Sequence, residues 1–517
     1  MPTTAVPRAP RRLLALALPI AAAAVIAGCG ASTGAGGTDP AGLVPASAPV
    51  YLEAALRPDD QEAGDARTAF GKILRTSDPG AKLVELIDRH AGRAGIRFAE
   101  DIEPWLGDRV GVGVLTFARE RADTVAIAAS TDNAKAQAAL DKLQRGGEKR
   151  TDRGVDYTFD ADDQTAAAVV GDAVVIGTEP GLKGAVDASK GSSLAEADAL
   201  KRARATVSQE RSGFAYLDVA GVLRQAVGAA GDTAAQAAPL LDPVAKALPK
   251  TVAAAVDAEP DLLRVDSASV GQPASARPAK SGADALAALP ADAWLGAGAG
   301  ELGQTLTNFL DTVASGGGLA GIGVEALLRQ LQQTTGLDLR KDVLAWMGDA
   351  GFFVAGTNPD DARGALVIAS KDPAATRRTV QTLRRLVGGG RDVRDLDAPG
   401  VDEGFLIRGD GGRHDLLVAA GGDKFVVAVG RHALAEALDP GATLGGTAAF
   451  TDAASKLGGG VRPSFFLDVE RLTTLLDAKK GSHFDRVKPY FEAFGVVVGG
   501  GRQDGDIGRG RAIATLK

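Results

Sequence analysis

Cys29 is the only cysteine of the chain, and its position indicates a specific covalent chemistry. It ends the run Ile26-Ala27-Gly28-Cys29, which follows an apolar stretch and three arginines, at positions 8, 11 and 12. This run is typical of a bacterial lipobox, in which the leader is cut before the cysteine and the sulfur receives a diacylglyceryl group. We therefore expect a signal peptide at 1–28 and a lipid, such as palmitate, on Cys29. Two acyl chains would hold the protein stably at the extracytoplasmic face of the cell membrane.

Two Trp-x-Gly-Asp sequences contain the next residues that could take part in binding. They place Trp105 beside Asp108 and Trp346 beside Asp349, and they use two of the three tryptophans in the chain. One interpretation is a pair of ligand sites, in which the indole stacks and the carboxylate is a polar handle. The other is a buried indole that anchors a turn, with a glycine at positive φ and an aspartate bonded to nearby amides. We favour the structural interpretation, because large aromatic side chains chiefly supply buried area.

A predicted helix from Pro373 to Leu386 carries four arginines opposite its apolar residues. They are Arg377, Arg378, Arg384 and Arg385. Such a cationic stripe would suit anionic lipid headgroups or an acidic envelope polymer. The alternative, which we favour, is an ordinary solvated helix face.

No motif predicts a metal site, a cofactor or a catalytic centre. None of the four histidines, at positions 90, 414, 432 and 483, has metal-ligand spacing to another. A Gly-x-Ser-x-Gly match at 30–34 lies outside any strand-turn-helix, and a dinucleotide-like match at 298–303 is weak in a chain with 67 glycines. The formal net charge of -7 argues against nucleic acid as a partner. We expect a protein that is not an enzyme; a hydrolase using carboxylates alone is a less favoured alternative.

The chain reads as a tandem repeat. Pro45-Ala46-Ser47-Ala48 returns as Pro290-Ala291-Asp292-Ala293, and the Trp-x-Gly-Asp sequences follow at similar spacing. In both copies, a Ser-x-Asp sequence ending at Asp132 or Asp372 is expected to cap a helix. The offset between the copies changes little along the chain, so we expect two homologous domains with insertions only in loops.

Each half predicts an α+β domain with a mainly antiparallel sheet and helices packed on one face. Strands are expected at 110–115 and 124–129, with hairpin turns at 160–163, 259–261, 409–412 and 503–505. The predicted boundaries are a flexible tether at 29–43, a first repeat at 44–269, a linker at 270–282 and a second repeat at 283–517.

The lipobox, the Pro-Ala-x-Ala opening and the Trp-x-Gly-Asp sequences resemble an uncharacterised bacterial lipoprotein family, domain of unknown function 3352, of actinobacterial type. The resemblance covers nearly the whole chain after residue 28. It implies location and fold, and it carries no catalytic residues over to this sequence.

The expected function is that of a non-enzymatic binding or scaffold protein of the cell envelope. Its expected partners are the membrane, through the lipid on Cys29, and an envelope protein or apolar ligand. A carrier of lipid or another apolar ligand is the main alternative, because sheet and helices can enclose an apolar cavity.

Overall fold

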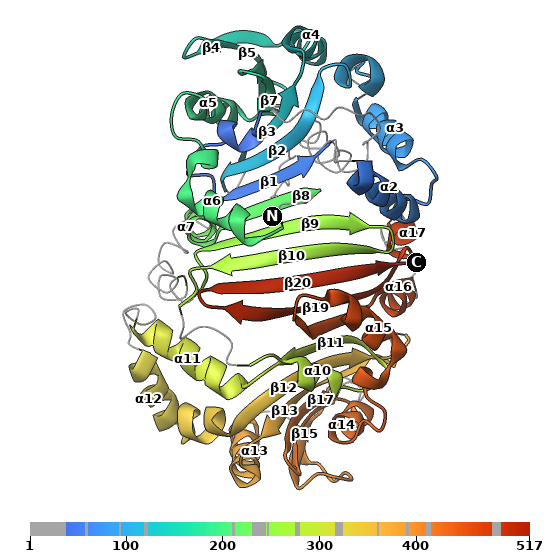
Figure 1. The fold of residues 1–517 in the computed structure, drawn as a ribbon. Helices are drawn as coiled ribbons and strands as arrows, with labels where there is room; N and C mark the ends of the chain where they lie inside the picture. The colour runs from blue at the N-terminus through green and yellow to red at the C-terminus, as the bar shows by residue number, and fades with distance from the viewer. Residues whose placement is uncertain are drawn as a thin grey trace, which may run out of the picture. The chain divides into compact units, whose positions relative to one another are not determined.

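The computed structural model describes residues 38–56, 60–91, 95–117, 122–208, 212–229, 245, 248–273, 280–315, 324–358, 361–388, 392–409, 415–477 and 487–517. Cys29, the predicted signal peptide and the first part of the predicted tether lie outside these residues. The chain divides into two compact units. We call described residues 38–229 and 249–271 unit 1 and described residues from 280 onward unit 2 (Figure 1).

Unit 1 is an α+β unit built on one antiparallel sheet. Its strands are β1 (Val50–Ala55), β2 (Leu106–Thr116), β3 (Asp123–Ser130), β4 (Glu148–Asp152), β5 (Val155–Asp160), β6 (Thr165–Val169), β7 (Ala173–Gly177), β8 (Gly213–Asp218), β9 (Thr251–Glu259) and β10 (Leu262–Val270). They lie in the order β4-β5-β6-β7-β3-β2-β1-β8-β9-β10, with every pair antiparallel. Its described helices are η1 (Pro40–Leu43), α2 (Asp60–Leu74), α3 (Pro79–Ala91), η3 (Phe98–Ile102), α4 (Asn133–Leu143), α5 (Glu179–Ala188), η4 (Leu194–Glu196), α6 (Asp198–Thr206) and α7 (Val219–Ala229).

Unit 2 is likewise α+β with one antiparallel sheet. Its strands are β11 (Ala293–Ala299), β12 (Met347–Ala355), β13 (Arg363–Ser370), β14 (Val393–Asp395), β15 (Glu403–Ile407), β16 (Leu416–Gly421), β17 (Lys424–Val429), β18 (Arg462–Asp468), β19 (Phe494–Asp504) and β20 (Ile507–Leu516). They lie in the order β14-β15-β16-β17-β13-β12-β11-β18-β19-β20. Its described helices are α10 (Ala283–Ala287), α11 (Leu302–Ser315), α12 (Val324–Thr335), η6 (Leu339–Val343), η7 (Leu344–Trp346), α13 (Pro373–Val387), α14 (Arg431–Leu438), η9 (Leu444–Gly446), α15 (Ala448–Leu457), α16 (Val469–Asp477) and α17 (Lys488–Phe491).

Several local predictions are confirmed. The two strands expected at 110–115 and 124–129 lie within β2 and β3, and the closing hairpins join β9 to β10 and β19 to β20. Asp132 caps α4 by accepting a hydrogen bond from Lys135 N, and Asp372 caps α13 through Ala375 N. These features depend on short-range chemistry, which the sequence displays directly.

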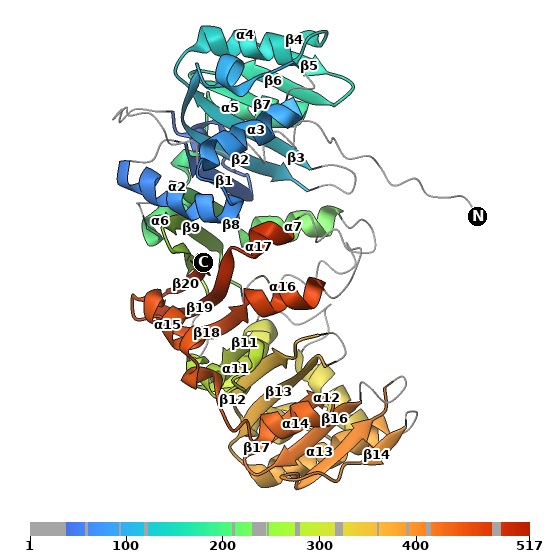
Figure 2. The same cartoon turned by 90° about the vertical axis from the view of Figure 1, so that its right-hand side faces the viewer.

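Helices cover both faces of the sheet in unit 2, so the prediction of helices on one face is wrong. On one face, Leu286 and Leu289 pack over Gly296, where an added Cβ would lie 2.8 Å from the Leu286 side chain. On the other face, Val380 of α13 joins the same buried cluster as Ile368. In unit 1, Ala136 and Leu140 of α4 belong to the buried cluster of the sheet. This helix lies beside β6 (Figure 2). The physical reason is that apolar side chains lie on both faces of the sheet, so that helices pack on both, although they leave part of one face uncovered.

The predicted tether at 29–43 extends too far into the folded chain. Pro40–Leu43 form η1, and Asp39 caps this helix through Ala41 N. Ala41 and Leu43 are buried, and an added Cβ on Gly111 would lie only 2.6 Å from Pro40 Cβ. Small residues therefore serve close packing here, and unit 1 begins by Asp39.

The predicted linker is also shorter than 270–282. Residue 270 ends β10, and residue 280 forms a β-bridge with residue 300; residues 274–279 lie outside the described ranges.

Candidate functional site

The two tryptophans of the Trp-x-Gly-Asp sequences are buried inside their units. Trp105 is 6% exposed and donates its indole N–H to Asp101 O at 2.6 Å. Trp346 is 2% exposed and donates to Asp342 O at 2.8 Å, and its ring centroid lies 5.4 Å from that of Phe425. Each indole closes a π-helical turn, η3 or η6, onto the core. This geometry gives both rings a packing role rather than a stacking surface for a ligand.

The glycines after the tryptophans are required for close packing and not for a left-handed turn. Gly107 and Gly348 both lack a positive φ, which corrects the prediction. An added Cβ on Gly107 would lie 2.8 Å from Ala129 Cβ, and one on Gly348 would lie 3.0 Å from Ala369 O. The neighbouring strand therefore leaves no room for a larger residue.

The two aspartates have different surroundings. The structure gives Asp108 a backbone role, since its carbonyl accepts from Leu56 N at 2.7 Å. The Asp349 carboxylate pairs with Lys280 Nζ at 2.8 Å and accepts from Glu301 N at 3.0 Å. Burial raises the pKa of Asp349, but these hydrogen bonds outweigh burial and lower the pKa overall. Asp349 is therefore held ionised, bonded to an amide as the structural interpretation expects.

Asp349 also lines a cavity of about 250 Å³ in unit 2. Its walls are mostly alanine, leucine, proline and valine side chains, and its polar residues are Asp284, Asp349, Asp423, Lys424 and Glu436. Lys424 Nζ donates to Leu438 O at 2.7 Å, which stabilises the carboxyl end of α14. Lys424 and Asp349 at this cavity thus take part in internal contacts.

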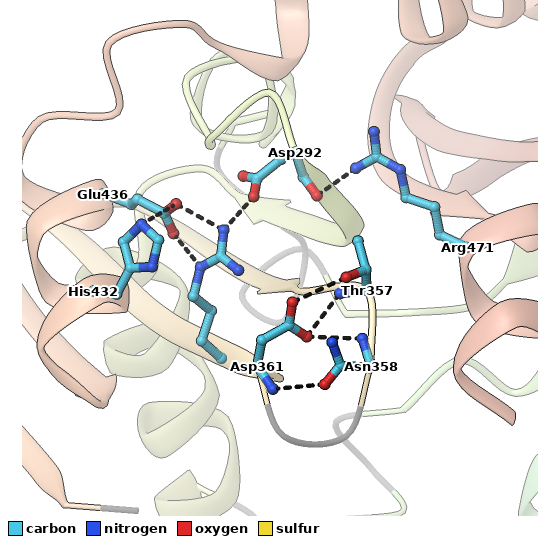
Figure 3. Close-up of polar contacts among 8 residues, drawn as sticks. Asp292, Thr357, Asn358, Asp361, His432, Glu436 and Arg471 are labelled. Atoms are coloured by element: carbon cyan, nitrogen blue, oxygen red, sulfur yellow. Dashed lines mark hydrogen bonds and ion pairs between the residues drawn. The ribbon is translucent and has the colours of Figure 1, made fainter. Parts of the chain in front are cut away.

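Glu436 belongs to an ion-pair cluster at one end of the unit 2 sheet. Arg363 donates to both carboxylate oxygens of Glu436 at 2.8 Å and also pairs with Asp292. Figure 3 shows Glu436 also facing His432, with the backbone carbonyl of Asp292 bonded to Arg471. The bidentate arginine joins α14 and the start of β11 to β13. Asp361 closes the nearby loop on its own amides.

The four arginines predicted to form a cationic surface lie on α13 as expected, but two of them face acids. Arg384 pairs with Asp395 at 2.5 Å, and Arg377 lies 3.5 Å from Asp402. Arg385 donates to Thr382 Oγ1 on its own helix, and Arg378 is exposed. Nearby carboxylates therefore reduce the positive charge of this face.

The histidines add no metal site in the part of the chain that the structure describes. His432 lies 3.2 Å from Glu436, and no group of three potential ligands occurs among the described residues. His90 lies on α3, but its side chain is not described, and His414 and His483 lie outside the described residues. No described helix is long and apolar enough to cross a membrane.

The sheet of unit 2 carries two adjacent rows of apolar residues on the face that α13 only partly covers. Directly paired residues of antiparallel strands share a face. The outer row runs from β20 to β15 through Ala514, Val497, Leu467, Leu295, Val354, Gly364, Val429, Leu416 and Ile407. The inner row includes Phe465, Ala297 and Phe352, paired across β18, β11 and β12. We call these two rows the apolar strip.

The apolar strip is partly exposed although every residue in its outer row is apolar: two of the nine outer-row residues are exposed and the other seven are half-buried. Phe352 is 41% exposed, Leu416 37%, and Phe465 and Val429 36% each. On the opposite face, the row between them is buried: Phe353 and Leu417 are 0% exposed and Phe466 is 2% exposed. A half-covered sheet normally presents polar side chains to water. The strip is therefore a feature of unit 2 that packing within the described chain does not account for.

Unit 1 has a similar but smaller surface. Leu52 is 46% exposed and pairs with Val112 on one side and Ala215 on the other. Two residues earlier, Val50 pairs with Val114 and Leu217. The rows of paired residues that contain Leu52 and Val50 continue through β9 to β10. On β10 the residues of both rows are serines rather than apolar residues.

Sequence reasoning missed the apolar strip. In many strands, apolar and polar residues alternate, which distinguishes the buried face from the solvent-exposed face. This alternation is absent here, because β12 and β17 are apolar at consecutive positions. Only strand register shows which residues share a face. The signal available in the sequence was the run Phe352-Phe353-Val354, which is apolar on both faces at once.

Comparison with known proteins adds the family. No curated protein matches the chain by sequence. Among solved structures, crystal form III of TP0453 is 14% identical, covers 46% of this chain and 81% of that chain, and has a TM-score of 0.27. Crystal form I of TP0453 is 12% identical, covers 45% and 78%, and has a TM-score of 0.25. Likeness at this level carries no argument about fold or function. The family model described as "Protein of unknown function (DUF3352)" matches residues 13–494, and the chain belongs to this family.

Proposed function

We propose that the protein is a non-enzymatic binding or scaffold protein of the cell envelope, anchored at the extracytoplasmic face of the membrane through fatty chains on Cys29. The observation that carries the binding function is the apolar strip, because contiguous exposed apolar surface on a folded protein marks an interaction site. The charged residues near the cavity of unit 2 support this proposal, since Asp349, Arg363 and Glu436 take part in internal ion pairs.

The anchor is tested by replacing Cys29 with serine in the full chain. We expect the unsubstituted protein to incorporate labelled palmitate and to sediment with membranes, and the Cys29→Ser protein to do neither, because two acyl chains supply the stable attachment. The measurement is membrane fractionation with metabolic labelling. A Cys29→Ala protein serves as the matched control and should behave like the serine variant. Full membrane retention of both variants would contradict the lipoprotein proposal.

A second candidate function is that of a carrier or binder of lipid or another apolar ligand. The observation that favours it is the continuity of the outer row of the apolar strip across nine strands without a polar side chain. The residues that carry most of the binding energy at protein interfaces are enriched in Trp, Tyr and Arg. The four most exposed residues of the strip are instead Phe352, Leu416, Phe465 and Val429.

We further propose that the two units are tandem homologous copies. The supporting observation is that the two sheets have the same strand order. In unit 1, β1 lies between β2 and β8, and β4 lies at one edge. In unit 2, β11 lies between β12 and β18, and β14 lies at one edge. Both copies also close a π-helical turn with a buried tryptophan, Trp105 or Trp346. Duplication would explain why both units carry an exposed apolar face.

A further inference from the structure

We propose that the apolar strip of unit 2 binds one extended acyl chain of a membrane phospholipid and leaves the headgroup in water. This inference deepens the second candidate function and rests on it. Three observations carry it: the shape of the strip, the helices beside it, and the charges at its outer edge.

The strip is long and narrow. Its outer row crosses nine paired strands, and its inner row is exposed at Phe465 of β18 and Phe352 of β12. Strands about 4.8 Å apart and rows about 7 Å apart give roughly 40 Å by 7 Å, or about 300 Å². A stable protein interface buries about 800 Å² on each partner. One acyl chain spans one leaflet, about 15 Å of a 30 Å hydrocarbon core, and therefore fits along the strip.

Helices border the inner row of the strip. Leu383 of α13 and Leu302 of α11 pack on the same buried cluster as Leu366 and Val427 of the inner row. A helix is about 10 Å across, so the strip lies at the foot of a step. The step would hold a flat bilayer or a large protein away from the sheet. A single flexible chain can lie against the sheet beside the helices.

The outer edge of the strip carries arginines that already have acidic neighbours. Arg471, in the helix after β18, lies 3.4 Å from Asp468, and Arg408, after β15, lies 3.8 Å from Asp392. Among the described residues of this edge, the arginines are paired with carboxylates and form no dedicated site for a free carboxylate, which favours a lipid chain over a free fatty acid. The proposed anchor at Cys29 would keep the protein beside phospholipid, the most abundant source of such chains.

The test uses the full chain with Cys29→Ser and vesicles of phosphatidylglycerol that carry one parinaroyl chain. The fluorescence of this chain rises when the lipid leaves the crowded vesicle for a protein site. We expect saturable transfer of one lipid per protein after the vesicles are removed by centrifugation. Phe352→Asp and Phe465→Asp should each weaken binding at least ten-fold, because a charge would lie against the chain. Leu331→Asp, at a 41% exposed position on α12 that belongs to neither row of the strip, should leave transfer unchanged.

Circular dichroism and thermal unfolding check that each variant is folded. If an aspartate variant does not fold, the double variant Phe352→Ala and Phe465→Ala should bind about ten-fold more weakly. The proposal is overturned if the protein with an unsubstituted strip takes up no lipid, or if the strip variants take up as much lipid as it does. It is also overturned if the protein binds intact vesicles without extracting lipid, or if it binds parinaric acid but not the lipid. None of these results alters the Cys29 fractionation test, so failure of this inference is distinct from failure of the anchored binding function.

Discussion

Replacing Trp346 with alanine is expected to lower the free energy of unfolding of unit 2 by about 3–5 kcal/mol. The indole is 2% exposed, lies against Phe425, and donates its N–H to Asp342 O. Alanine would leave a cavity next to α13 and free the η6 turn. The measurement is equilibrium denaturation followed by circular dichroism.

Trp346→Phe is the matched control, because it keeps a ring against Phe425 and removes mainly the indole N–H, which donates to Asp342 O and Thr379 Oγ1. It should cost about 1–2 kcal/mol. If Trp346→Ala unfolded at the same denaturant concentration as the unsubstituted protein, the indole would not support the core. The ligand-stacking interpretation of the Trp-x-Gly-Asp sequences would then be favoured.

Replacing Arg204 with alanine is expected to destabilise unit 1 by about 3–5 kcal/mol, because it would leave a buried carboxylate without its main cation. Arg204 contacts Glu53 at 2.5 Å and Asp39 at 2.7 Å, and the Glu53 side chain is 7% exposed. Tyr51 also donates to Glu53, at 3.0 Å, and Arg109 pairs with it at 2.8 Å. The cluster joins the first residues of unit 1 to α6 and β1.

A double-mutant cycle with Glu53→Gln measures this interaction directly, and the double variant should lose less stability than the sum of the single variants. Arg224→Ala is the surface control: Arg224 is 71% exposed and lies 3.7 Å from Asp218, so it should change stability by less than about 0.5 kcal/mol. Additive losses at Arg204 and Glu53 would show that the pair is not coupled.

The pH dependence of this cluster follows from Asp39. Burial raises the pKa of Asp39, but the hydrogen bond and charge of Arg204 outweigh it, and the pKa is lowered from 3.8. A lowered carboxyl pKa gives stability that is fully present above the ordinary value and is lost as the pH falls below it. The destabilisation caused by Arg204→Ala should therefore shrink in acid below pH 3.8.

The sequence predicted the features that depend on neighbours along the chain. The helix caps at Asp132 and Asp372, the strands in β2 and β3 and the closing hairpins all follow local chemistry. The sequence did not predict the features that depend on close packing between segments far apart in the chain. Gly107 resembles a turn glycine, but its requirement comes from Ala129 on the adjacent strand.

The candidate site was less predictable than the fold because it depends on register. Phe352 and Phe465 lie far apart in the sequence and meet on one face only because both strands pair with β11. The same limitation produced the wrong expectation that helices cover one face. A residue pattern that is apolar on both sides of a strand does not indicate which side the helices leave open.

The most direct test of the central claim, that an exposed apolar face of this protein binds an apolar ligand, compares native and denaturing mass spectra of the full protein recovered from its host membrane. The covalent lipid contributes equally to both spectra, so any difference in mass is a ligand held without a bond. The account predicts a native mass that exceeds the denatured mass by that of one or more lipids. Equal masses in the two spectra would contradict it.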